Sequence, residues 1–194
     1  MQSDIMIMDG SWSGFLRERG MPMGVCPEHW IWQRPALAAE VARRYLAAGT
    51  QYLRTPTFGA SPLRLKHWGL DELYLSINRD LAARLRGSLP EDALLGGNIG
   101  PSGLALGPSS TMTFEDAVRN FAQQAQALLE GGVDSFYVQS MTDLNEARAA
   151  LIGIRQVSDL PVLVTLAFTG GQTPGGDLPA CCSIVLEALG ASAW

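Results

Sequence analysis

Short apolar runs alternate with longer segments of helical period along the chain. Five of these runs read as strands, at residues 5–9, 51–57, 94–100, 135–141 and 161–168, and a sixth begins in the final ASAW at residues 191–194. Strands that are buried on both faces have this nearly continuous apolar pattern. The pattern therefore predicts an α/β fold with a parallel sheet and crossover helices.

The segments between these runs carry helical periodicity and signals for helix ends. Four helices are predicted, within residues 34–50, 71–87, 113–132 and 143–158. Asp71 is the predicted N-cap of the second helix and Gly87 its end. Thr113 and Asp116 stand at the spacing of a capping box at the start of the third.

Two stretches, residues 21–34 and 169–179, are predicted to be long loops, and long βα loops are where such folds place their sites. The loop after the first strand, DGSWSGFL, lacks the glycine spacing of a dinucleotide site. About five and a half strand–helix units fit into the 194 residues, whereas a closed eight-stranded barrel takes about 250 residues. The chain is therefore too short to close such a barrel.

Composition and charge exclude several classes of function. The net charge is −5 and the fourteen Lys and Arg residues are scattered, so nucleic acid is not expected as a partner. The sequence has neither the pattern of a signal peptide nor an apolar run of about 20 residues, so we expect a cytoplasmic protein without a membrane anchor. Three cysteines do not suggest a disulfide framework, which leaves free thiols or metal ligands.

Four motifs together resemble the homocysteine S-methyltransferase family, which includes the amino-terminal domain of cobalamin-dependent methionine synthase and betaine–homocysteine methyltransferase. The motifs are IMDGSWSGFLRERG, RTPTFGAS, GGNIGPSG and LLEGGVDSFYVQSM, in the family's order and spacing. The resemblance extends from Met6 to Trp194. It implies a (β/α)8 barrel, of which residues 1–194 would form a single incomplete domain with about five and a half units.

The resemblance also implies a function and a cofactor. Family members transfer a methyl group to the thiolate of homocysteine or a related thiol, from a corrinoid, betaine or sulfonium donor. Zinc held by three cysteine thiolates binds the acceptor thiol and keeps it as the attacking thiolate. The family's zinc cysteines follow the point where this sequence stops, so we expect no metal site and no activity in this chain alone.

The adjacent Cys181 and Cys182 resemble the family's zinc pair but stand in a different setting. Pro179 is predicted to start a helix that ends near Gly190. Cys181 is then expected to face the core, with Cys182 beside it. The alternative, a zinc site, would also have to recruit Cys26.

The resemblance implies five substrate-binding residues: Asp9, Gly10, Thr57, Asn98 and Gln139. Asp9 follows an apolar strand, where barrels place their chemistry, although it could instead cap the next turn. Asn98 is expected to point towards the barrel mouth. Gln139 stands where the family has a glutamate that pairs with the substrate ammonium, and its amide can offer only a neutral hydrogen bond. No catalytic residue is identified.

Trp12, Pro56 and Gln139 all depart from the family's motifs. They indicate either an altered substrate or a lost activity, and the sequence leaves both open. The competing hypothesis is a non-catalytic homologue that binds a corrinoid protein or a separately encoded second half-barrel. An open barrel would also leave a strand edge and apolar surface uncovered, which predicts self-association.

Overall fold

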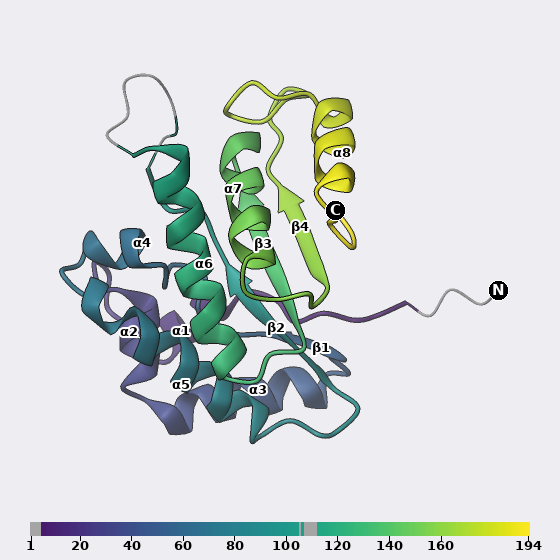
Figure 1. The fold of residues 1–194 in the computed structure, drawn as a ribbon. Helices are drawn as coiled ribbons and strands as arrows, with labels where there is room; N and C mark the ends of the chain where they lie inside the picture. The colour runs from purple at the N-terminus through teal and green to yellow at the C-terminus, as the bar shows by residue number, and fades with distance from the viewer. Residues whose placement is uncertain (1–4, 105, 107–111) are drawn as a thin grey trace.

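The computed structural model describes residues 5–104, 106 and 112–194, and it contains one parallel sheet (Figure 1). Its strands are β1 (Tyr52–Arg54), β2 (Leu94–Ile99), β3 (Ser135–Met141) and β4 (Val162–Leu166). They lie in chain order, β1-β2-β3-β4, and every pairing is parallel. Four of the predicted strands are thereby confirmed, with β1 and β4 shorter than predicted.

The first predicted strand is reduced to a single bridge. Residues 5–9 run beside β1, where Met8 forms an isolated parallel bridge with Tyr52. The backbone N–H of Asp9 donates to the Tyr52 carbonyl oxygen at 3.2 Å, which ends the pairing. The prediction of a full strand was therefore wrong, although the segment lies where that strand would be.

The final segment pairs with the opposite edge of the sheet in the same limited way. Ala193 forms an isolated parallel bridge with Leu163 of β4. The backbone N–H of Val164 donates to the Ala193 carbonyl oxygen at 2.9 Å. The predicted start of a sixth strand is thus present as a single bridge, and residues 191–194 form no strand.

The four predicted helices are present. They are α3 (Pro35–Ala47), α5 (Tyr74–Arg86), α6 (Phe114–Glu130) and α7 (Leu144–Arg155). Thr113 and Asp116 form the predicted capping box of α6, and Gly87 is the C-cap of α5. Asp71 is not the N-cap of α5. It begins a short 3-10 helix, η1 (Asp71–Leu73), so that α5 starts three residues later, with Leu73 as its N-cap.

Three short helices were not predicted. They are α1 (Trp12–Glu18), α2 (Pro27–Trp32) and α4 (Pro62–Lys66). Residues 21–34, predicted as a loop, therefore contain α2, which has proline at its first position and Ile31 fully buried. A helix of only six residues is too short to show a helical period in the sequence. Residues 169–178 contain no helix and no full strand, as predicted, although Thr169 and Gln172 form an isolated antiparallel bridge.

The last helix, α8 (Pro179–Ala188), starts where predicted but presents a different face to the core. Cys182 and Leu186 are fully buried, whereas Cys181 is exposed and Ile184 is 70% exposed. The predicted core position of Cys181 was therefore wrong. Because almost every residue of this helix is apolar, the hydrophobic pattern could not determine which side packs against α7.

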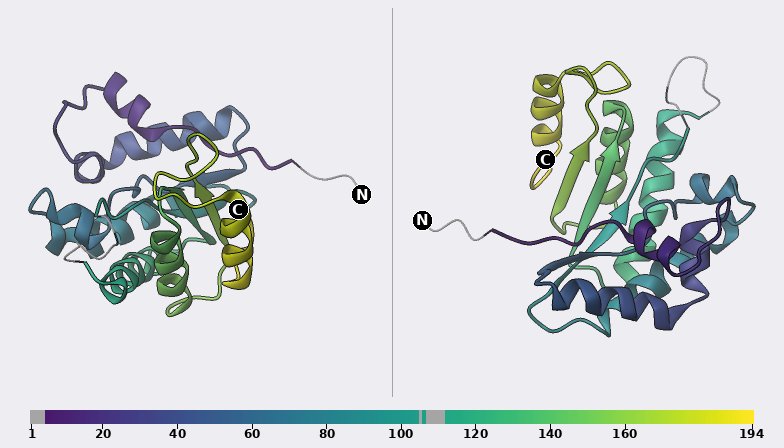
Figure 2. Two further views of the ribbon diagram at one scale, coloured as in Figure 1. Left: turned by 90° about the horizontal axis from the view of Figure 1, so that it is seen from above. Right: turned by 180° about the vertical axis from the view of Figure 1, so that it is seen from behind.

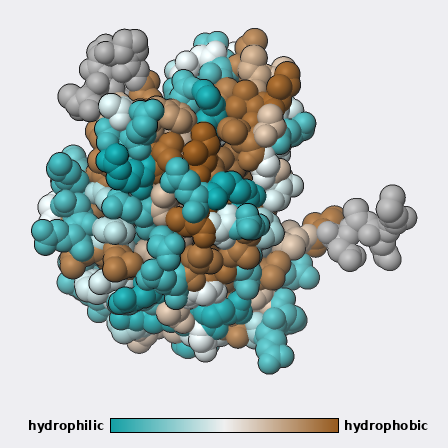
Figure 3. Space-filling view, in the orientation of Figure 1, coloured by the Kyte–Doolittle hydropathy of each residue, from teal (hydrophilic) through white to brown (hydrophobic). Residues whose placement is uncertain are grey.

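Helices α5, α6, α7 and α8 cover one face of the sheet, as the two views of Figure 2 show. The main core lies between them and includes Leu53, Leu95, Phe136 and Val138, all fully buried. A second cluster, around Ile31 and Leu81, joins the amino-terminal helices to α5. Apolar residues are also visible on the surface over α8 in Figure 3. Among the described residues, no helix combines the length and apolarity needed to span a membrane.

Candidate functional site

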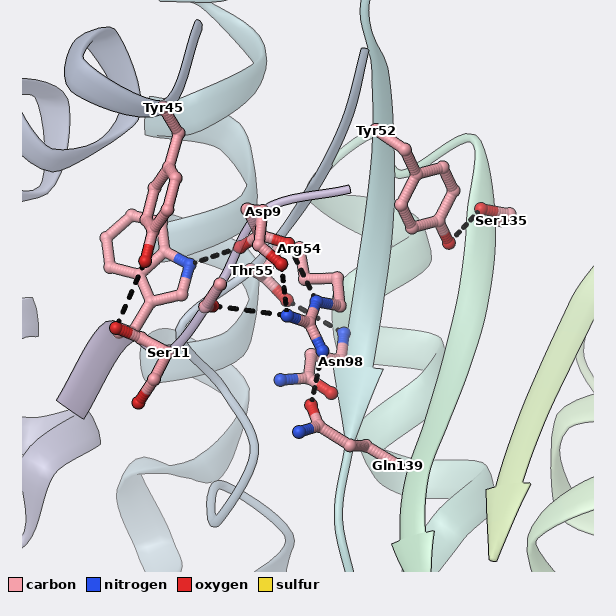
Figure 4. Close-up of polar contacts among 11 residues, drawn as sticks. Asp9, Ser11, Tyr45, Tyr52, Arg54, Thr55, Asn98, Ser135 and Gln139 are labelled. Atoms are coloured by element: carbon pink, nitrogen blue, oxygen red, sulfur yellow. Dashed lines mark hydrogen bonds and ion pairs between the residues drawn. The ribbon is translucent and has the colours of Figure 1, made fainter. Parts of the chain in front are cut away.

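Arg54, the last residue of β1, connects the three segments that end at one edge of the sheet (Figure 4). Its Nε donates to Asp9 Oδ1 at 2.7 Å. Its Nη2 donates to the backbone oxygens of Asp9, at 2.7 Å, and Gly10, at 3.1 Å. Its Nη1 donates to Gln139 Oε1 of β3 at 3.0 Å. These contacts use four of the five N–H groups of the guanidinium.

Asp9 is enclosed by its partners, and its side chain has no exposed surface. Besides Arg54, the indole Nε1 of Trp12 donates to Asp9 Oδ2 at 2.8 Å. Burial raises the pKa of Asp9 above its ordinary value, while the hydrogen bonds from Arg54 and Trp12 act in the opposite direction. Trp12, one of the departures from the family's motif, therefore serves as a partner of this carboxylate.

Asn98, near the end of β2, brings a buried amide to the same edge. Its side chain oxygen Oδ1 has no hydrogen-bond partner within the described part of the chain, and the residue is only 6% exposed. Its backbone is held by two threonines: the N–H donates to Thr55 Oγ1 at 2.9 Å, and the carbonyl accepts from Thr57 Oγ1 at 2.8 Å. Thr57 is fully buried and positions the backbone of Asn98.

A cavity of about 410 Å³ opens at this edge of the sheet. Gly10, Arg54, Asn98 and Gln139 line it. This is the carboxyl end of β1, β2 and β3, where α/β folds place their binding sites. Four of the five expected substrate-binding residues thus gather here, since Asp9 lies directly behind Arg54. Thr57 does not line the cavity.

Sequence reasoning missed Arg54. The signal was present, because an arginine inside an otherwise buried strand has to find a carboxylate partner. Asp9, at the end of the neighbouring segment, is that partner. Two of the three departures from the family's motifs contact this ion pair, since Trp12 donates to Asp9 and Gln139 accepts from Arg54. The third, Pro56, lines the cavity.

The cysteines do not form a metal centre. No group of three or more His, Cys, Asp or Glu side chains that could hold a metal ion occurs among the residues that the structure describes. Cys26 donates to Glu28 Oε2 at 3.4 Å, and burial, aided by the charge of Glu28, raises its pKa to about 12. Its thiol is therefore protonated at neutral pH, which is unfavourable for binding zinc. Cys181 and Cys182 face different surroundings on α8. The described residues do not fit the zinc site that the family resemblance implies.

Solved structures of similar shape include the homocysteine methyltransferase MmuM from Escherichia coli. Its metallated form matches with a TM-score of 0.80 and 20% sequence identity, over 97% of this chain and 72% of that chain. Its oxidized form matches with a TM-score of 0.79 at the same identity, over 97% and 71% of the two chains. Its apo form gives a TM-score of 0.73 and 18% identity, over 97% and 70%. These likenesses show an α/β fold similar to the TIM barrel of that enzyme.

The family itself is shown by the sequence. The model of the family described as homocysteine S-methyltransferase matches residues 6–193. This range covers nearly the whole chain, including the segments that surround the cavity. The chain belongs to the homocysteine S-methyltransferase family.

Proposed function

We propose that this chain is part of a methyl-transfer domain, and that its cavity holds the methyl acceptor, homocysteine or a related small thiol. The observation that carries the proposal is the cavity at the carboxyl ends of β1, β2 and β3, in a chain of this family. Its size suits a molecule of homocysteine's dimensions, since small-molecule sites commonly measure about 300 to 1,000 Å³.

The strand ends form the polar end of the cavity, and the surrounding segments form a wall that is apolar in part and includes Glu28. Arg54, Asn98 and Gln139 supply polar groups from three neighbouring strands. Leu16 and Phe58 lie on the wall. A thiol ligand would place its charged end against the polar groups and its methylene chain along the wall, which orients the sulfur and excludes water.

Methyl transfer to a thiol forms a sulfur–carbon bond while the bond between the methyl carbon and the donor breaks, and the donor keeps that electron pair. The attacking species is the thiolate. The described residues do not fit the family's zinc site, so the proposal assigns them binding and orientation of the acceptor only. We expect no methyl transfer by this chain alone.

The second candidate is a non-catalytic homologue that binds a corrinoid protein or a second half-barrel. One observation favours it: Arg54 already engages the carboxylate of Asp9 and the Oε1 atom of Gln139. Neither group is then free to receive a substrate ammonium. The two candidates differ in whether the cavity binds a thiol at all.

Calorimetric titration of the chain with homocysteine tests the proposal. We expect saturable binding that is lost in Ser13→Phe, because Ser13 is an exposed residue of α1 that lines the cavity. Glu18→Phe places the same side chain at an exposed position of α1 outside the cavity, and binding should survive. Equal binding by both variants, or none by the unmodified chain, would reject an acceptor site here. A search for methylated homocysteine by mass spectrometry, with each class of donor and added zinc, tests the expected inactivity.

A further inference from the structure

We propose that Arg54 makes the polar end of the cavity a receptor for a carboxylate and excludes an ammonium group from it. The thiol ligand would therefore present an acidic group at this end. This inference rests on the proposed function, because it specifies which chemical class of thiol the same cavity accepts. It also makes Arg54 a specificity-determining residue.

The carboxylate of Asp9, which would be the natural partner of an ammonium at this end, is already occupied. Both carboxylate oxygens of Asp9 accept hydrogen bonds, one from Arg54 and one from Trp12, and the side chain has no exposed surface. Arg54 lines the cavity whereas Asp9 does not. A ligand at this end of the cavity therefore contacts the positive charge of Arg54 and not the negative charge of Asp9.

The groups of Arg54 and Gln139 that remain without a partner are hydrogen-bond donors. The fifth N–H of the Arg54 guanidinium, on Nη1, has no acceptor within the described part of the chain. Because a guanidinium can only donate, Gln139 must turn its Oε1 towards Arg54, which leaves its Nε2 amide group for a ligand. A charged and a neutral donor side by side suit a carboxylate, whose oxygens only accept.

Asn98 gives independent support for a ligand at this place. It lines the cavity, is 6% exposed, and its Oδ1 lacks a partner among the residues described. A buried acceptor without a donor is unfavourable, so the cavity is suited to a ligand that carries one. Both a thiol and an ammonium group are such donors, so Asn98 supports a ligand in this cavity without selecting its charged group.

Glu28 is the remaining charged side chain on the cavity wall, and it lies on α2. Its Oε1 accepts from the backbone N–H of Gly59 at 2.7 Å, and its Oε2 accepts from Cys26. An amine that bound beside Glu28 would compete with the orientation proposed here. The experiment must therefore separate the acid group of a ligand from its amine.

Two probes each lack one charged group of homocysteine. The first, 4-mercaptobutyrate, lacks the ammonium, and the second, 3-mercaptopropylamine, lacks the carboxylate. In calorimetric titrations of the unmodified chain we expect 4-mercaptobutyrate to bind at least about tenfold more tightly, a difference of about 1.4 kcal/mol. Tighter or equal binding of 3-mercaptopropylamine would overturn the inference while the thiol site stands. Binding of neither probe nor homocysteine would overturn the inference and the proposed function together.

The Gln139→Glu variant provides a second test, because the glutamate side chain has nearly the same size and shape as that of glutamine. It places a carboxylate against Arg54 and removes the Nε2 donor, so the preference for 4-mercaptobutyrate should fall at least about tenfold. Gln123→Glu adds the same charge at an exposed position of α6 outside the cavity, and the preference should persist. An unchanged preference in Gln139→Glu would show that Arg54 and Gln139 do not select the ligand.

Discussion

Arg54 is a charged side chain at the end of a buried strand, with only 12% of its surface exposed. Such a residue is tolerated because Asp9, Gln139 and two backbone carbonyls accept its hydrogen bonds. Desolvating two charges costs free energy that their attraction offsets only when the geometry is good. We therefore expect the Arg54–Asp9 pair to matter more for excluding an ammonium group from the cavity than for stabilising the fold.

A double-mutant cycle tests this view of the ion pair. Arg54→Met and Asp9→Asn should each lower the free energy of unfolding by about 3 to 5 kcal/mol, since each leaves the other group buried without its charged partner. The double variant should cost less than the sum, with a coupling of about 1 to 3 kcal/mol. Urea unfolding gives these values. The more exposed pair Arg44–Glu40, whose Glu40 also pairs with Arg19, is the control, and its coupling should stay below about 1 kcal/mol. Additive effects of the buried pair would contradict the close interaction.

At the scale of elements, the packing of α6 on α7 depends on a residue without a side chain. A Cβ at Gly153 of α7 would lie 2.6 Å from the Val118 carbonyl oxygen and 2.9 Å from the Ala122 nitrogen. Both are backbone atoms of α6, so the helices would have to move apart. The absence of a side chain at this position therefore determines how closely the two helices approach.

Gly153→Ala should consequently destabilise the fold. Alanine favours a helix over glycine by about 1 kcal/mol, but the overlap should outweigh this gain and leave a net loss of about 1 to 3 kcal/mol. Gly87→Ala at the C-cap of α5 is the control, because its Cβ would have ordinary contacts, the nearest at 3.5 Å, and its φ is −67°. Urea midpoints compare the two, and a stabilised Gly153→Ala would show that the helices yield easily.

The elements differ in how well their sequence predicts them, and each difference has a physical cause. Strand β3 matches its predicted range because both of its ends are marked by a change from apolar to polar residues. The face of α8 was mispredicted since a helix that is apolar nearly all round has no distinctive side. The carboxyl edge could be predicted from the strand ends. The position of Arg54 in a buried strand signalled a charged partner, but the partners themselves could not be predicted, because they depend on pairing between strands, which a pattern along one strand does not reveal.

At the scale of the whole molecule, both edges of the sheet carry exposed apolar side chains. Ile5 is 84% exposed in the segment beside β1. Leu178, Ile184 and Trp194 are 55%, 70% and 48% exposed near β4. Among the described residues, each outer strand gains only a single bridge from the neighbouring segment. The sheet therefore presents unpaired backbone groups next to apolar surface, a combination that favours pairing with another chain.

We therefore expect this chain to self-associate, as the sequence predicts for an open barrel. Sedimentation velocity should show a mass that increases with concentration, because association follows mass action. Ile184→Lys places a charge at a 70% exposed apolar position of α8 and should weaken association at least about tenfold, which corresponds to about 1.4 kcal/mol. Leu75→Lys introduces the same charge on α5, away from β4, and should leave association unchanged. A monodisperse monomer that unfolds cooperatively would contradict the prediction and would show that the single bridges at Met8 and Ala193 are enough to protect both edges.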